Sequence, residues 1–202
     1  SQNLEENTGY YINVGYAALA DAAGNFYTGF SDTSSFNFTT GDATSPVLLA
    51  TSPSDDAPLA RVYTTIDLIF DEAVYPTSGT ITLHRTSDGA TVETISATSS
   101  QVTGDDANSM GAYRTIFIDP AADFASNTDY YVNITPGAFA DEAGNPYAGL
   151  SGLTSWSFAT ADTTAPVLVA TTPANGATGV GVGTNITLEF SEDVFAGTGD
   201  IT

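Results

Sequence analysis

The sequence predicts an all-β protein made of tandem antiparallel β-sandwich repeats. Three observations support this prediction. Short segments alternate apolar and polar residues with a period of two, as at Ile66, Leu68 and Phe70, which is typical of strands with one buried face. Clusters of Gly, Pro, Asp and Asn separate these segments. The whole pattern then recurs after about 120 residues.

The repeat is visible when the sequence is shifted by 120 residues. Residues 7–82 then align without a gap on residues 127–202, and 36 of the 76 positions are identical. We therefore divide the chain into the C-terminal part of one repeat (1–41), a complete repeat (42–162) and the N-terminal part of a third (163–202). Because both ends fall inside repeats, we expect the chain to be a segment of a longer polymer.

The complete repeat contains seven predicted strands, each rich in β-branched or aromatic residues and bounded by turn residues. In chain order they are residues 47–51, 65–70, 79–85, 91–97, 113–118, 130–134 and 155–159, with a further short strand expected near 101–102. Turns are expected at 53–56, 87–89, 104–106, 123–129 and 143–146, and residues 137–141 are the one segment compatible with a helical turn. Such a strand count in one repeat indicates an antiparallel sandwich.

The two ends of the repeat resemble a known family. The opening carries PVL at 166–168, PANGATGV at 173–180 and NITLEFSE at 185–192, and the close carries NTDYYV at 127–132, DEAGNP at 141–146 and SFAT at 157–160. These motifs resemble bacterial Ig-like repeats of the surface-layer and giant-adhesin type. The resemblance covers essentially all of the chain and implies an extracellular, cell-surface location. It says little about function, because such modules occur in adhesins, surface layers and secreted enzymes.

The composition limits what the protein does. The chain has 24 Asp and Glu residues, three arginines, no lysine and no cysteine, and its formal net charge is −21. Disulfides, cysteine metal sites and lysine-based covalent chemistry are therefore excluded. An acidic surface repels nucleic acid phosphates and anionic membranes, so we expect neither as a partner. The longest apolar runs are too short to span a membrane, and residues 1–7 lack the features of a signal peptide.

Three acidic segments are predicted to meet at one pole of the sandwich. In an Ig-like unit, the start of the chain and the loops after the second and sixth strands share a pole, which here means residues 41–46, 71–74 and 141–145. Without a cation these carboxylates would repel one another, and hard oxygen ligands from loops suit calcium. We predict a calcium site held by Asp42, Glu72 and Asp141, with Asp71, Glu142 or the Asn145 amide nearby.

The next junction is predicted to repeat this site with Asp162, Glu192 and Asp193, because Asp42 recurs as Asp162 and Glu72 as Glu192. A second interpretation needs no metal. Asp and Asn side chains cap turns through their own backbone, and an Asp-x-x-Gly-Asn sequence forms a good turn by itself. The spacing differs from that of an EF-hand loop, so no motif decides between the two interpretations.

No catalytic set is visible in the sequence. The pairs Asp55-Asp56 and Asp105-Asp106 lie in expected turns without an apolar wall to raise one pKa. His84, the only histidine, lies on a predicted strand, and Trp156 occupies the position of Phe36, as expected for a core aromatic residue. We therefore expect no enzymatic activity.

These observations favour a structural function. We expect a spacer segment of an extracellular bacterial adhesin, fibre or surface layer, stiffened by calcium at the junctions, with neighbouring repeats as its partners. Two alternatives stay open. One is a binding module that holds a glycan or a cell-surface protein, and the other is an accessory domain of a secreted enzyme. Pairing of one chain's C-terminal strands with the next chain's N-terminal strands is a variant of the spacer hypothesis.

Overall fold

The structure is a computed structural model that describes residues 3–106 and 113–201. The described residues form strands, and no helix among them is long and apolar enough to cross a membrane. The strands are β1 (Gly9–Tyr11), β2 (Asn37–Thr39), β3 (Leu48–Ser52), β4 (Ala57–Ala60), β5 (Ile66–Pro76), β6 (Thr80–Arg85), β7 (Thr91–Ser96), β8 (Val102–Asp106), β9 (Tyr113–Ile118), β10 (Asp129–Ile134), β11 (Phe139–Ala140), β12 (Ser157–Thr160), β13 (Leu168–Thr172) and β14 (Thr187–Phe190). The predicted all-β class is confirmed.

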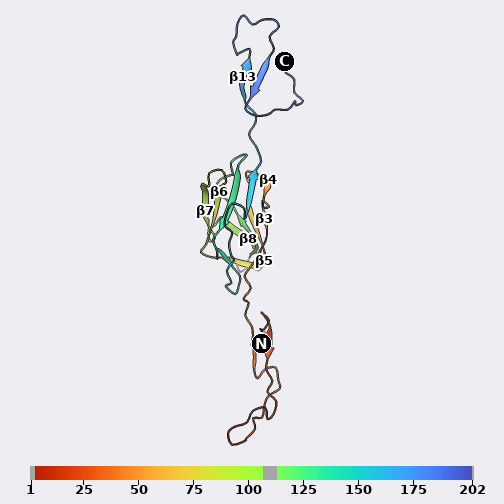
Figure 1. Ribbon diagram of the computed structural model, residues 1–202, viewed down its shortest axis with the longest axis vertical. Coiled ribbons are helices and arrows are strands. Elements are labelled where there is room, and N and C mark those ends of the chain that lie inside the picture. The colour runs from red at the N-terminus through yellow and green to blue at the C-terminus, as the bar shows by residue number, and fades with distance from the viewer. Residues whose placement is uncertain (1–2, 107–112, 202) are drawn as a thin grey trace.

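The complete repeat is a sandwich of two sheets and occupies the middle of the molecule in Figure 1. One sheet has the strand order β4-β12-β10-β6-β7, and the other has the order β11-β5-β9-β8, with β3 also paired to β5. Every pairing is antiparallel except that of β4 with β12. The order places the first predicted strand beside the second, and the sixth between the third and the last.

The core lies between these sheets and follows the predicted alternation. Ile66, Leu68 and Phe70 of β5 are buried, while Ile69 is 38% exposed. The ring of Phe70 contacts those of Phe139 and Tyr147 at centroid distances of 5.7 and 5.1 Å. Alternation therefore identified the buried face correctly.

One segment predicted as a loop, 71–74, and one predicted as a turn, 104–106, lie in strands. Residues 71–74 belong to β5, which continues to Pro76 with a register shift against β9 between Ile69 and Val74. Val74 is fully buried, so an apolar contact after the irregularity keeps the strand in the sheet. Residues 104–106 belong to β8, which pairs with β9. The Tyr113 ring covers Gly104 so closely that a Cβ there would lie 2.2 Å from the Tyr113 Cγ.

Two short strands were not predicted. Strand β4 lacks clear alternation and pairs in parallel with β12 at the sheet edge, with Leu59 73% exposed. Strand β11 replaces the helical turn considered for 137–141, and it pairs with Tyr75 and Pro76 of β5. Phe139 is fully buried there, so tertiary packing fixes an extended conformation that the local sequence does not indicate.

The partial repeats keep the local pairings of the complete one. Tyr10 pairs with Phe38 in β1–β2 as Tyr130 pairs with Phe158 in β10–β12. Ile186, the counterpart of the fully buried Ile66, is however 79% exposed. Residues 163–202 contain no counterparts of the strands that cover Ile66. Ile186 therefore occupies a core position without the strands that would bury it.

Candidate metal centre at the first junction

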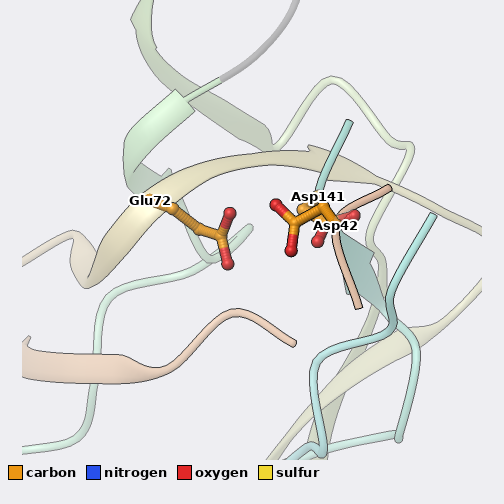
Figure 2. Close-up of side chains that lie close together, drawn as sticks. All are labelled: Asp42, Glu72 and Asp141. Carbon is orange, nitrogen blue, oxygen red and sulfur yellow. The ribbon is translucent and has the colours of Figure 1, made fainter. Parts of the chain in front are cut away.

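Three carboxylates from distant parts of the sequence meet at one end of the complete repeat. Asp42 precedes β3, Glu72 lies in the irregular part of β5, and Asp141 follows β11. Each offers one carboxylate oxygen, and these oxygens lie within 4.8 Å of one another. Figure 2 shows the Glu72 carboxylate directed toward those of Asp42 and Asp141. We call these three residues the acidic trio.

Asp141 is the most deeply placed member of the trio, at 5% exposed. Its Oδ1 accepts a hydrogen bond from the Asn145 backbone N–H at 2.8 Å, and its Oδ2 accepts one from the Asn145 Nδ2 at 2.7 Å. Gly144 lies between them with a φ of 90°, a conformation that favours glycine. Asn145 therefore orients the Asp141 carboxylate, and the equivalent loop repeats these contacts between Asn25 and Asp21.

The pKa of the Glu72 carboxyl is raised above its usual value. Burial is the largest cause raising the pKa of its carboxyl, followed by the negative charges of Asp141, Asp42 and Asp71. The Arg114 guanidinium opposes this shift, and its Nη1 donates a hydrogen bond to the Asp71 backbone carbonyl at 2.5 Å. A cation at the trio would remove the repulsion that raises this pKa.

Hydrogen-bond donors lower the pKa of Asp42, which lies beside Glu72. Its Oδ1 accepts a hydrogen bond from the Thr44 backbone N–H at 3.0 Å, and its Oδ2 accepts one from the Asn7 Nδ2 at 3.2 Å. The Thr44 N–H is the largest cause holding the Asp42 pKa below its usual value, followed by the Asn7 side chain. These donors therefore favour the charged form of Asp42, which is the form that binds a cation.

The neighbouring predicted residues lie outside the trio. Asp71 is exposed, and its Oδ1 accepts a hydrogen bond from the Val47 N–H at 2.8 Å. Glu142 is exposed on the loop after Asp141. Asn145 acts on Asp141 through its amide nitrogen.

The second junction holds part of the same arrangement. Asp162 accepts hydrogen bonds from the Thr164 N–H at 2.9 Å and the Ser126 hydroxyl at 3.0 Å, and these two contacts, in that order, are the main causes lowering its pKa. Glu192 is half-buried, and a hydrogen bond with its side chain lowers the Asp162 pKa by a smaller amount. Asp193 is exposed. Residues 163–202 include no counterpart of Asp141, and the described residues gather three such ligands only at the first junction.

Other residues weighed in the sequence have packing roles. The His84 ring stacks on Tyr131 at a centroid distance of 4.6 Å and an angle of 9°. Trp156 is fully buried, and its Nε1 donates a hydrogen bond to the Pro53 carbonyl at 2.9 Å. Asp55 accepts a hydrogen bond from the Ser157 N–H at 2.8 Å, so this carboxylate holds β12.

Sequence reasoning missed two residues that act on the trio. Arg114 could not be placed beside Glu72 without knowing how β9 pairs with β5. Asn7 could have been noticed in the sequence, because it recurs as Asn127. In the structure both residues adopt a positive φ, 50° and 49°. A repeated asparagine between polar residues is typical of that backbone conformation.

Comparison with known families agrees with this architecture. The family described as "Bacterial Ig-like domain" matches residues 42–160 and 162–202. The chain belongs to the bacterial Ig-like domain family. The first match covers nearly all of the complete repeat, and the second covers the start of the next. Membership confirms the family resemblance at this level, without assigning the surface-layer or giant-adhesin type.

This bacterial Ig-like chain was also compared with solved structures and with curated proteins. A solved structure of CopC from Methylosinus trichosporium OB3b is similar to it, with 14% identity and a TM-score of 0.39 over 59% of this chain and 97% of that chain. No curated protein matches the sequence.

Proposed function

We propose that this bacterial Ig-like chain is a structural spacer of an extracellular surface protein, of the adhesin or surface-layer type, and that calcium stiffens its inter-repeat junctions. The acidic trio is the observation that carries the proposal. Asp42 lies in the linker that leads into the complete repeat (residues 42–46), whereas Glu72 and Asp141 belong to the body of that repeat. An ion bound to all three would tie the linker to that repeat.

The chemistry of the trio fits calcium. All three side chains offer hard oxygen ligands, and neither a histidine nor a cysteine is among them. Calcium takes six to eight such ligands in flexible geometry, with backbone carbonyls and waters completing the shell. Extracellular calcium modules bind with dissociation constants of about 10⁻⁴ to 10⁻³ M, and we expect a value in this range.

Calorimetric titration of the 202-residue chain with calcium tests the proposal directly. Wild type should bind calcium at the first junction, and Asp141→Asn should abolish that binding. Asp88→Asn is the matched control, because it also removes one negative charge but from the turn beside Arg85, outside the trio. Equal titrations of wild type and Asp141→Asn would refute the site.

The spacer role needs a separate measurement. Small-angle scattering should give a narrower distribution of end-to-end lengths in calcium than in chelator, and Asp141→Asn should remove that difference. An unchanged distribution, at calcium levels that saturate wild type, would leave a calcium site without a stiffening function.

A further inference from the structure

We infer that each linker (residues 42–46 and 162–166) is clamped by both of the repeats that it joins, so that motion between consecutive repeats is confined to one or two residues. These are Ser45 at the first junction and Ala165 with Pro166 at the second. The inference deepens the proposed spacer function and rests on it for its purpose. The clamps themselves need no metal.

At the first junction the preceding repeat holds the linker through Glu6 and Asn7. The Glu6 Oε2 accepts hydrogen bonds from the Thr44 hydroxyl at 2.6 Å and the Ala43 N–H at 3.4 Å. The Asn7 Nδ2 donates to Asp42 at 3.2 Å. Three consecutive linker residues are thereby bound to the repeat that they leave.

At the second junction a different side chain makes the same grip. The Ser126 hydroxyl donates to the Asp162 Oδ1 at 3.0 Å and accepts from the Thr163 N–H at 2.8 Å. It also lies 3.3 Å from the Thr164 hydroxyl. One hydroxyl supplies one donor and two acceptor positions, so these three contacts use its full capacity. Glu6 and Ser126 occupy equivalent positions, which shows that the contact recurs although the residue does not.

The clamp is built on a rigid corner of the preceding repeat. The Tyr130 hydroxyl accepts a hydrogen bond from the Ala125 N–H at 2.9 Å, as in the tyrosine corner of immunoglobulin-like sandwiches. Thr160, only 3% exposed, donates its hydroxyl to the Ala125 carbonyl at 2.7 Å and accepts from the Thr128 N–H at 2.9 Å. Hydrogen bonds within the preceding repeat therefore fix the backbone around Ser126 without any contribution from the linker.

The following repeat grips the other end of the linker. Val47 donates its N–H to the Asp71 Oδ1 at 2.8 Å, and Asp71 returns its N–H to the Val47 carbonyl at 3.0 Å. Val167 and Ser191 form the same pair of contacts at 2.9 Å each. Pro46 is buried, so at the first junction this grip begins one residue after Ser45.

At most two residues are left between the two grips, namely Ser45 at the first junction and Ala165 with the exposed Pro166 at the second. No hydrogen bond involves Ser45 or Ala165 within the described residues. Each precedes a proline, which disfavours the helical region for it, and the proline fixes its own φ. At the first junction Asp42 lies before Ser45, and Glu72 and Asp141 lie after it. An ion at the trio would therefore bridge the one free residue.

The second junction offers the cleaner test, because Ser126 and residues 162–164 contact one another at the end of the complete repeat. Amide exchange by NMR on the whole chain should show the Thr163 amide protected and the Ala165 amide unprotected. Ser126→Ala should speed exchange at Thr163 by about 2- to 10-fold, the equivalent of one net hydrogen bond, and leave Ala165 unchanged. Ser99→Ala is the matched control, since the Ser99 hydroxyl is buried with no partner among the described groups.

Two outcomes would overturn the inference. One is a Thr163 amide that exchanges as fast as Ala165 in wild type, and the other is a Thr163 rate unaffected by Ser126→Ala. Repeating the measurement in chelator separates the clamp from calcium. If the effect of Ser126→Ala persists in chelator, the clamp stands even where calorimetry finds no calcium site. If chelator abolishes the effect, a clamp that needs no metal is refuted.

Discussion

Replacing Glu72 with Gln should stabilise the complete repeat in the absence of calcium and remove its response to calcium. Glutamine keeps the length and shape of the side chain but carries no charge. In the calcium-free protein the substitution removes repulsion from Asp42 and Asp141. In calcium it also removes a charged ligand, so the same change acts in opposite directions in the two conditions.

The distances in the trio set the expected magnitude. At 4.8 Å, the upper limit of the separations between the three carboxylate oxygens, two unit charges repel by about 0.9 kcal/mol in a water-like dielectric and about 3.5 kcal/mol at an effective dielectric of about 20. Glu72 is half-buried and solvent ions screen the pair, so the lower part of the range applies. We expect Glu72→Gln to stabilise the calcium-free repeat by about 1–2 kcal/mol. Calcium at ten times its dissociation constant should stabilise wild type by about 1.4 kcal/mol and the variant hardly at all.

Urea unfolding followed by the fluorescence of Trp156 provides the assay. Trp156 is the only tryptophan and is fully buried in the complete repeat, so its signal reports that repeat alone. Each variant is unfolded in chelator and in calcium, with sodium chloride holding the ionic strength equal, and the midpoints are compared at constant m-value. Asp88→Asn should keep the full calcium response. A Glu72→Gln variant that is less stable than wild type in chelator, or that retains the calcium response, would refute the reasoning.

Three further predictions follow from the same contacts. The pKa of Glu72 is raised in the folded state, so the folded protein binds that proton more tightly than the unfolded chain does. Wild type should therefore gain stability relative to Glu72→Gln as the pH falls from 7 to about 4. Urea midpoints of the two proteins that stay equally far apart over this pH range would contradict the prediction. Asn145→Ala removes the side-chain donor that orients Asp141 and should weaken calcium binding by about 10- to 100-fold, measured by calorimetry, with an unchanged affinity arguing against positioning. Trp156→Phe leaves the Pro53 carbonyl without its donor and should lower the free energy of unfolding by about 1–2 kcal/mol. Urea unfolding followed by circular dichroism measures this change, and a midpoint at the wild-type value would refute it.

The fold was predictable where local pattern and tertiary burial agree. The alternation around Leu68 identified a core face because Ile66, Leu68 and Phe70 are all buried between the two sheets. It failed where long-range packing decides the backbone. Asp71 and Glu72 look like turn residues in sequence, yet the buried Val74 holds them inside β5. Phe139 likewise becomes part of a short strand because it packs against Phe70.

The geometry of the site was predictable because topology determines which loops share a pole. Asp42, Glu72 and Asp141 were grouped on that basis, and the structure brings them together. The clamps could not be predicted by comparing the repeats. That comparison looks for identical residues, and it misses a contact that different residues make at equivalent positions. Glu6 and Ser126 differ in type and charge, and only their hydrogen bonds reveal that they do the same work.

Glu72 differs from the other acidic residues of this chain, whose formal net charge is −21. The aspartates with shifted pKa values, Asp21, Asp32, Asp42 and Asp162, are all lowered, because backbone and side-chain donors in their own turns stabilise the charged form. Glu72 is the one acid shifted the other way, and no hydrogen bond reaches its side chain among the described residues. Turn capping therefore accounts for those aspartates without a metal, as the second interpretation of the sequence allowed. It does not account for Glu72, so a cation would contribute most where this carboxylate meets its two neighbours.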